Sequence, residues 1–427
     1  MKHTVSEVKL KNGAKGLLIN VPDASVMTVE FNFRAGEYLV PENKWEAPHI
    51  MEHVLLGANK LVPNARAFQA EFEKNGAYSN ASTSAYDITY EAECADFEWD
   101  RIIDLLLTAI TQPLFLEEEF KAEFGNVREE LASRSNNHFR HLSLALRQAY
   151  GFAVKTDQQR LKLMDNVSLA DIKKHYKNTH TTSNLRFVIA GHIDPERRKI
   201  IKNKLEKTLL PEGTGRYELP DEMPTTIGTP LIIKNSTVDN LYFYIDTFLL
   251  RRLRDPESDA LNLINNMLTE TLYSRILGTA RERGLVYHMS SGFGQSKQTS
   301  NWWFGAQVMP ANASALFDII VKEIKNVRKG KLKEEDIAAA KQYLIGRYQR
   351  SGQTVGGTMV GYSMRYFFDG QIDDYYKVPA RIKAVTKERV LSVTEAMFND
   401  HVRGMGLLGN VDESMAKSLE DQSKPLW

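Results

Sequence analysis

The chain has 427 residues, of which 42% are hydrophobic and 26% charged, so it has enough apolar material for two or more globular domains. Its 55 basic and 54 acidic side chains nearly cancel, so the overall charge gives no reason to expect nucleic acid or an anionic membrane as a partner. The single cysteine, Cys94, excludes an intrachain disulfide and a cysteine-rich metal site.

The N-terminal stretch MKHTVSEVKLKNGAKGLLIN has no apolar core of the signal-peptide kind. No segment approaches 18 uninterrupted apolar residues, so the sequence predicts no membrane span. A single cysteine also fits a reducing compartment. We therefore expect a cytoplasmic protein with no membrane partner and no nucleic-acid partner.

The first half of the chain alternates predicted strands and helices. The segment VKLKNGAKGLLI predicts a β-hairpin, because the dipeptide Asn12-Gly13 favours a tight turn between strands. The other predicted elements are strands at 26–36, within 77–94 and at 184–192, and helices at 47–56, 67–76, 97–111 and 116–134.

A polar, proline-containing stretch at 210–230 has the composition of a linker. Beyond it the same order of elements recurs. LEEEF at 116–120 matches KEEDI at 333–337, which gives an offset of about 217 residues, the length of one whole domain. The predicted elements are strands at 241–250, 284–293 and 301–309, and helices at 258–277, 315–329 and 332–350.

This repetition sets the expected fold class. We predict two tandem homologous α+β domains, each a mainly antiparallel sheet with helices packed on one face. The expected boundaries are 1–212 for the first domain, 213–230 for the linker and 231–427 for the second domain.

The stretch APHIMEHVLL carries the most specific chemical signal. Its His49, Glu52 and His53 form an H-x-x-E-H pattern, and residues three and four apart share a face of a helix. Both histidines can therefore point at one ion. Zinc suits imidazole nitrogens, and a catalytic zinc site has three protein ligands and an open position. A third ligand from another element is needed if Glu52 is to act as a base. The alternative is two core histidines on an apolar helix.

The long acidic helix at 116–134 is the expected source of the third ligand. Glu123 and Glu130 lie seven residues apart, on one face of the helix. Val127 lies between them, which indicates that this face packs against apolar residues. Glu129 points about 100° away around the helix. The geometry therefore favours Glu130 over Glu129, and a plain solvated acidic face is the alternative.

These residues resemble the insulinase/pitrilysin-type zinc metallopeptidases, the inverzincins, in which an H-x-x-E-H helix precedes a ligand glutamate. Here Glu130 follows His53 by 77 residues, and Glu123 precedes Glu130 by seven, as in the family pattern. The resemblance implies that His49, His53 and Glu130 bind one Zn²⁺ per chain. It also implies that Glu52 is the general base and that Glu123 is a supporting carboxylate.

A second stretch, GAYSNASTSAYDITY at 76–90, is similar to the family strand beside the metal, whose edge pairs with the extended substrate backbone. Asn80, Ala81 and Ser82 are the candidate substrate-binding residues. A strand with only a structural role is the alternative.

In the second half, LYSRILGTARERGLVY resembles the helix and strand that bring an arginine and a tyrosine to the active site. Tyr287 matches the tyrosine. The family arginine commonly lies seven residues earlier, where this chain has Ala280. Arg281 takes that role only if the connecting turn is one residue shorter.

The resemblance implies a zinc-dependent endopeptidase that hydrolyses peptides or unfolded segments. The second half lacks H-x-x-E-H, and one active and one inactive half is the arrangement of the shorter two-domain members, which are similar to mitochondrial-processing-peptidase subunits. Such chains usually pair, so a homodimer or a heterodimer with a related chain is expected. The alternative is a non-catalytic or partner-dependent subunit of a heterodimeric peptidase or assembly complex.

Overall fold

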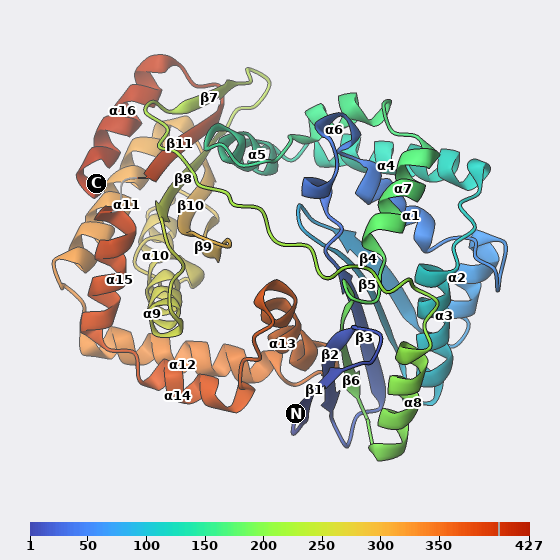
Figure 1. The fold of residues 1–427 in the computed structure, drawn as a ribbon. Coiled ribbons are helices and arrows are strands. Elements are labelled where there is room, and N and C mark those ends of the chain that lie inside the picture. Colours follow the sequence, from blue (N-terminus) through green and yellow to red (C-terminus); the bar gives the residue numbers. More distant parts are fainter. Residues whose placement is uncertain (400–401) are drawn as a thin grey trace. The chain divides into compact units, whose positions relative to one another are not determined.

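The computed structural model describes residues 1–399 and 402–427, and the chain forms two compact units, each built around one β-sheet (Figure 1). Unit 1 consists of Met1–Ala132, Gln158–Leu219 and Gln349–Tyr375. Unit 2 consists of Ser133–Asp157, Pro220–Tyr348 and Tyr376–Trp427. The expected division in chain order, with a linker at 213–230, stays a prediction.

The sheet of unit 1 has six strands in the order β1-β2-β6-β3-β5-β4, and β2 with β6 is its one parallel pair in the described chain. The first two strands form the expected hairpin, in which Gly13 adopts φ +89°, a conformation that side chains disfavour. The strands are β1 Thr4–Lys9, β2 Lys15–Asn20, β3 Val26–Phe33, β4 Tyr78–Thr83, β5 Ile88–Ala95 and β6 Arg186–Gly191.

The sheet of unit 2 has five strands in the order β7-β11-β8-β10-β9, with β7 and β11 parallel. This order repeats the order of unit 1 from β2 onward, including the place of the parallel pair. The repeated topology confirms the predicted α+β class with two mainly antiparallel sheets. The strands are β7 Leu231–Lys234, β8 Leu241–Leu249, β9 Met289–Gln295, β10 Ser300–Val308 and β11 Val402–Gly409.

One face of the unit 1 sheet is covered by helices whose apolar sides form a single core with the strands (Figure 1). This core contains the α1 helix of the H-x-x-E-H stretch and the long acidic helix α4, so both are fixed against the same sheet. The helices are α1 Ala47–Leu55, α2 Ala65–Glu73, α3 Trp99–Thr111, α4 Glu117–Arg134, α6 Asp157–Met164, α7 Leu169–Thr179 and α8 Pro195–Glu206.

The core of unit 2 is built in the same way, with corrections to two expected elements. The strand expected over 284–293 begins only at Met289 and ends at Gln295. The helix expected over 258–277 ends at Asn265, and a π-helical turn follows over Asn266–Glu270. The buried Asn265 side chain accepts hydrogen bonds from Trp302 and Ser291, which ties this point of the chain to the sheet. The helices are α9 Asp255–Asn265, α10 Leu277–Glu282, α11 Pro310–Arg328, α12 Glu334–Ser351, α14 Val378–Lys383, α15 Lys387–Asn399 and α16 Glu413–Ser423.

Each unit also contains a helix from the other half of the chain. Helix α13, Val355–Asp369, belongs to unit 1 and packs on the second face of its sheet. There Met359 and Tyr362 form an apolar cluster with Leu17 and Val188 of the strands.

Helix α5, His138–Ala149, belongs to unit 2 and packs on the second face of that sheet. Gly406 of β11 permits this close approach, because a Cβ atom there would lie 2.8 Å from the Leu142 side chain. Each sheet therefore has a helix on its second face, in addition to the helices on the one face that the sequence predicted.

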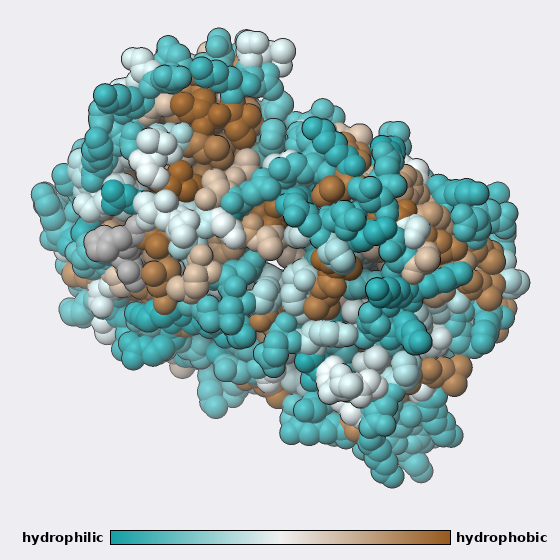
Figure 2. Space-filling view, turned by 45° about the horizontal axis from the view of Figure 1, so that its top comes forward, coloured by the Kyte–Doolittle hydropathy of each residue, from teal (hydrophilic) through white to brown (hydrophobic). Residues whose placement is uncertain are grey.

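Figure 2 shows one face of the molecule, on which polar residues predominate and apolar residues lie in separate groups among them. Within the described residues, no helix combines the length and the apolar character needed to cross a bilayer.

Candidate metal centre

Helix α1 presents the three motif residues on the side that does not enter the core. Its Ile50, Met51, Val54 and Leu55 are fully buried and pack into the core of unit 1. The opposite side of the helix therefore carries His49, Glu52 and His53. Pro48 lies in the first turn, where the absence of its N–H breaks no helical hydrogen bond.

Helix α4 brings Glu130 to both histidines. The Glu130 Oε2 atom lies 3.1 Å from His49 Nε2 and 3.6 Å from His53 Nε2. One ligand atom of each of the three residues lies within 4.8 Å of the others. Buried Val127 holds this face of α4 against the core, whereas Glu129 is exposed, which agrees with the geometric preference for Glu130.

A carboxylate also binds the far nitrogen of each imidazole. Glu46 Oε2 lies 3.1 Å from His49 Nδ1, and Glu123 Oε2 lies 3.0 Å from His53 Nδ1. When Nδ1–H is donated to a carboxylate, Nε2 keeps its lone pair for a metal ion and the ring orientation is fixed. These contacts fit a metal site with two histidines and one glutamate as ligands, a donor set used by catalytic zinc.

The charge balance of the cluster favours a cation. Burial lowers the pKa of His53, but hydrogen bonds with Glu123 and Glu130 raise it to about 9. Burial likewise lowers the pKa of His49, and hydrogen bonds with Glu130 and Glu46 outweigh this effect, so that its pKa lies above the ordinary range. The carboxylates therefore stabilise positive charge at the place where a divalent cation would bind.

Glu52 lies beside the cluster and has its own contact. Its Oε2 atom accepts a hydrogen bond of 2.8 Å from the Thr83 hydroxyl, at the end of strand β4. Glu52 is buried, and the three clustered ligand atoms come from other residues. The carboxylate is thus held next to the candidate ligands and is available for proton transfer.

Strand β4 forms the edge of the unit 1 sheet, and β5 is its one partner among the described strands. The candidate residues Asn80, Ala81 and Ser82 lie on it, and Asn80 and Ser82 are exposed. The free edge of such a strand can pair with an extended peptide backbone. Thr83 is the next residue of the same strand, so β4 contributes both the free edge and the hydroxyl that binds Glu52.

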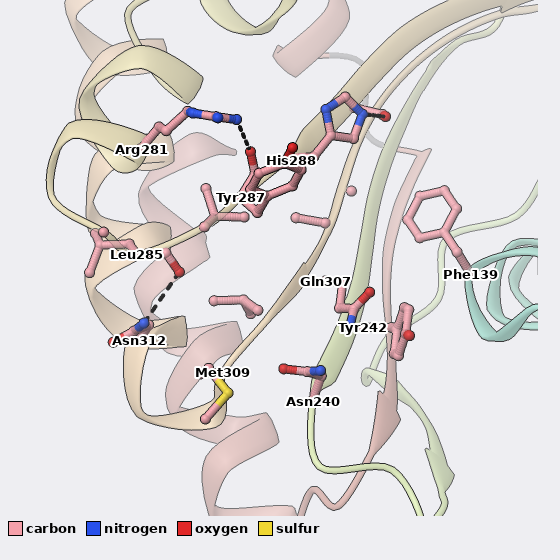
Figure 3. Close-up of a pocket in the computed structure, with 16 residues that line it drawn as sticks. Phe139, Asn240, Tyr242, Arg281, Leu285, Tyr287, His288, Gln307, Met309 and Asn312 are labelled. Atoms are coloured by element: carbon pink, nitrogen blue, oxygen red, sulfur yellow. Dashed lines mark hydrogen bonds between the residues drawn. The ribbon is translucent and has the colours of Figure 1, made fainter. Parts of the chain in front are cut away.

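Tyr287 and Arg281 lie together in unit 2 (Figure 3). The Arg281 Nη1 atom donates a hydrogen bond of 2.7 Å to the Tyr287 backbone oxygen, and its guanidinium lies 4.5 Å from the centre of the Tyr287 ring. The Tyr287 side chain is 81% exposed. Ala280, at the commoner position of the family arginine, is buried in the core of unit 2.

Three further residues support the centre and were not predicted from the sequence. Glu46 precedes His49 by three residues, a helical spacing that could have identified it. Arg160 donates to Glu46, with 3.0 Å between Nη2 and Oε2, but no sequence signal connects residues that far apart. Thr83 directly follows the predicted substrate-binding residues, and its contact with Glu52 joins two separate elements, which no local pattern reveals.

Two family models match the chain. The model described as "Insulinase (Peptidase family M16)" matches residues 17–161, which include the whole candidate centre. The model described as "Peptidase M16 inactive domain" matches residues 166–344, which include Arg281 and Tyr287.

Several curated relatives match part of the chain. An uncharacterized zinc protease of Rickettsia felis is 24% identical over 208 residues, which are 46% of this chain and 48% of the relative. Protease 3 of Escherichia coli is 27% identical over 124 residues, 29% of this chain and 13% of the relative. Insulin-degrading enzyme of Drosophila melanogaster is 26% identical over 123 residues, 29% of this chain and 12% of the relative. The matches thus span about half the length of the first relative and a smaller share of the others.

Solved structures match almost the whole chain. A protease from Helicobacter pylori has a TM-score of 0.82 at 18% identity, covering 95% of this chain and 100% of that chain. A putative M16-like peptidase from Alicyclobacillus acidocaldarius has a TM-score of 0.81 at 17% identity, covering 96% of this chain and 98% of that chain. At such identities these matches show the fold. The two family models, which match both halves of the chain, establish that it belongs to the insulinase-type peptidase family M16.

Proposed function

We propose that the protein is a zinc-dependent endopeptidase that hydrolyses peptides or unfolded segments. The observation that carries the proposal is the cluster of His49, His53 and Glu130, with a carboxylate on each imidazole Nδ1 and Glu52 beside it. The naming of matched relatives as zinc proteases supports the same interpretation of the cluster.

The proposed ligands of the ion are His49 Nε2, His53 Nε2 and a Glu130 carboxylate oxygen, one ion per chain. Zinc held by such residues supplies Lewis acidity, which acidifies water and polarises a peptide carbonyl. Glu46 and Glu123 keep the two imidazoles oriented for this task.

Glu52 is the proposed general base. It takes a proton from the attacking water and later delivers that proton to the leaving amine. The Thr83 hydroxyl holds the carboxylate in place for both transfers. Strand β4 pairs with the substrate backbone through Asn80, Ala81 and Ser82, which recognises main chain and so accepts varied sequences.

Tyr287 is proposed to donate a hydrogen bond to the carbonyl oxygen on which negative charge develops, with Arg281 as its neighbour. This role rests on the family resemblance. The hydrogen bond from Arg281 to the Tyr287 backbone oxygen keeps the two residues next to each other, which supports a joint role.

The test is cleavage of a mixed set of unstructured peptides by the purified full chain, with the Glu52→Gln variant beside it and zinc measured in both. We expect zinc in both proteins and cleavage in the wild type alone, because the amide of the variant keeps the shape of the side chain and cannot accept the proton. Cleavage by the variant at the wild-type rate would contradict the role of Glu52.

A partner-dependent subunit is the second candidate, because the inactive-domain model matches 166–344 and Ala280 stands at the commoner arginine position. Zinc in both proteins without cleavage in either would favour it.

We also propose that the chain works in the cytoplasm as a homodimer, or as a heterodimer with a related chain. Analytical ultracentrifugation of the purified chain tests the homodimer, and a monomer at micromolar concentration would contradict it.

A further inference from the structure

Unit 2 repeats the spacing of the candidate metal centre with different side chains. Helix α9 and the π-helical turn after it carry Asn262, Asn265 and Asn266, so an N-x-x-N-N pattern has the spacing of H-x-x-E-H in α1. The buried apolar residues of the two helices match at the same offset of 213 residues. The matched pairs are Ile50 and Leu263, Met51 and Ile264, Val54 and Met267, and Leu55 and Leu268.

A hydrogen bond to the sheet supports this correspondence. In unit 1, Glu52 accepts a hydrogen bond from the Thr83 hydroxyl of β4. In unit 2, the Asn265 side chain accepts a hydrogen bond of 2.6 Å from the Ser291 hydroxyl of β9. Strand β9 has the same place in the order of its sheet as β4 has in unit 1. Asn265 therefore occupies the position of Glu52.

An ion pair at the start of the helix is repeated as well. In unit 1, Glu46 accepts from Arg160, with 3.0 Å between Oε2 and Nη2. In unit 2, Asp259 stands at the matching position and accepts from Arg381, with 3.0 Å between Oδ2 and Nε. Two contacts that involve different elements thus agree on the same alignment of the helices.

Asn266 has lost the partner that its counterpart has in unit 1. It stands at the position of His53, whose Nδ1 atom contacts Glu123 of α4. At the offset of 217 residues that relates α4 to α12, Ala340 stands at the position of Glu123. Asn266 is only 4% exposed, and its Nδ2 atom has no hydrogen-bond partner among the described residues. Because a buried donor without an acceptor costs free energy, this amide marks a place where a ligand can supply the acceptor.

The donor set of this second centre does not suit a metal ion. Amide side chains replace both imidazoles, and Arg347 stands where Glu130 is the candidate third ligand in unit 1. The Arg347 guanidinium forms an ion pair of 2.7 Å with Glu270, so it supplies a positive charge in place of a ligand. Imidazole and carboxylate groups bind zinc, whereas amide and guanidinium groups suit organic ligands.

A pocket of about 750 Å³ opens at Asn266, and its volume lies within the range of small-ligand sites. Asn266, Met267 and Ala340 line it and are buried, so they form its floor. Tyr273 and Tyr343 also line it and are exposed, so they stand at its rim and offer aromatic faces. We call this space the α12 pocket.

The charged residues of the α12 pocket favour a cation. The charge of Arg275 is neutralised, because its guanidinium pairs with Glu323 at 2.7 Å. The other charged lining residues are Glu282, Lys333 and Asp336, and none of them has an ion-pair partner in the described part of the chain. Two unpaired carboxylates and one ammonium group leave a net negative charge, which attracts a positively charged ligand.

We propose that the α12 pocket binds a small organic cation, with an ammonium group at one end of an aromatic body and an oxygen acceptor at the other. The ammonium group pairs with Glu282 and Asp336. The aromatic body packs between Met267 and Tyr343, and the oxygen accepts a hydrogen bond from Asn266 Nδ2. The proposal does not depend on the proposed peptidase function, since none of these residues has a role in cleavage.

The probe is tyramine, an arylalkyl ammonium ion with a phenol oxygen, titrated into the full chain in a calorimeter. Two matched probes each lack one group: 4-ethylphenol has no ammonium group, and phenethylamine has no oxygen. We expect tyramine to bind about tenfold more tightly than 4-ethylphenol and about threefold more tightly than phenethylamine, because a charge-assisted pair contributes more than a neutral hydrogen bond.

The carboxylates are tested with the double variant Glu282→Gln and Asp336→Asn. Tyramine should bind this variant about tenfold more weakly, whereas 4-ethylphenol should bind it as it binds the wild type. The double variant Glu334→Gln and Glu335→Gln is the matched control, because both residues are exposed on the same turn of α12 and do not line the pocket. Equal weakening in the control would overturn the proposal.

The floor is tested by restoring the carboxylate of unit 1. Ala340→Glu gives Asn266 an acceptor and fills the pocket, so tyramine binding should fall at least about tenfold. Ala338→Glu, an exposed position of α12 outside the pocket, is its control. Asn266→Leu removes the donor and should abolish the preference for tyramine over phenethylamine, and urea unfolding checks that each variant is folded.

Three results would overturn the proposal: no saturable binding of tyramine, equal binding of tyramine and 4-ethylphenol, or wild-type binding by the carboxylate double variant. A preference for tyramine over phenethylamine that survives in a folded Asn266→Leu chain would overturn the role of the amide.

Discussion

Each imidazole of the candidate metal centre is in contact with carboxylates through both of its nitrogens. His49 lies between Glu46 and Glu130, and His53 lies between Glu123 and Glu130. The rings therefore have little freedom to turn, and the positions of the Nε2 atoms are set before any ion binds. Such preorganisation lowers the cost of assembling a metal site.

The third ligand can be tested against its neighbour in the sequence. Glu130→Gln removes a charged ligand, so we expect its zinc content after gel filtration to fall to a small fraction of the wild-type value. Glu129→Gln changes an exposed side chain one residue away and should leave zinc content unchanged. Zinc measured by mass spectrometry decides this, and equal loss in both variants would count against Glu130 as the ligand.

Under the proposed function, Thr83 is a positioning residue that acts through Glu52. Thr83→Val keeps the shape of the side chain but removes the donor, so turnover should fall about ten- to hundredfold, since a hydrogen bond to a charged group contributes about 1.5–3 kcal/mol. Thr83→Ser restores the hydroxyl and should restore most of kcat, while KM and zinc content stay near wild type in both variants. Failure of serine to rescue kcat would indicate a packing role instead.

At the scale of elements, the two exchanged helices each cover a buried carboxyl group on a central strand. Asp246 of β8 lies on the face that α5 covers, and burial raises its pKa to about 7 against a hydrogen bond from Asn301 and the charge of Arg147. Glu30 of β3 lies on the face covered by α13, and burial raises its pKa to about 7 as well. Both units therefore contain an acid that favours the protonated state.

This burial makes stability depend on pH. Between about pH 4 and pH 7 the folded chain keeps a proton on Asp246 that the unfolded chain releases, so the free energy of unfolding falls as the pH rises. Below about pH 4 Asp246 is protonated in both the folded and the unfolded chain, so no free energy is spent on burying a carboxylate. Above about pH 7 the folded state contains a buried carboxylate, at a cost of roughly 4 kcal/mol at most.

Asp246→Asn removes this titration, so the urea midpoint of the variant should change less between pH 4.5 and pH 8 than that of the wild type. Trp303 stacks on Tyr244 next to this site, and its fluorescence reports on unit 2. Asp318→Asn, on the surface side of α11, is the control and should keep the wild-type pH dependence. An unchanged pH dependence in Asp246→Asn would contradict the assignment.

Periodicity and turn chemistry were sufficient to predict most elements, and helical spacing singled out His49, His53 and Glu130, whose ligand atoms the structure brings together. The hairpin at Gly13 and helices α1 and α4 depend on residues near each other in the chain, so their patterns are visible in the sequence. The early end of α9 depends on the burial of the Asn265 amide against Trp302, a tertiary contact. The contact of Glu46 with Arg160 and the exchange of α5 and α13 join distant segments, which no local pattern reveals.

At the scale of the whole molecule, the exchanged helices decide which fragments can fold. A fragment of residues 1–212 lacks α13, so Leu17, Ile19 and Val188 would lose the apolar cover they have in unit 1. We expect this fragment to aggregate or to be cleaved rapidly in limited proteolysis. Addition of a 349–375 peptide should restore resistance, and a monomeric, resistant fragment without the peptide would contradict the expectation.

The three-segment composition of unit 1 also sets the timing of its folding during synthesis. The ribosome has made all six strands of its sheet by residue 219, but helix α13 begins only at Val355. At roughly 5 to 20 residues per second, the interval between these points lasts roughly 7 to 27 seconds. During that time the second face of a finished sheet remains uncovered on the nascent chain. Slow codons in this interval would lengthen the exposure, and a chaperone that binds apolar strands has its longest opportunity there.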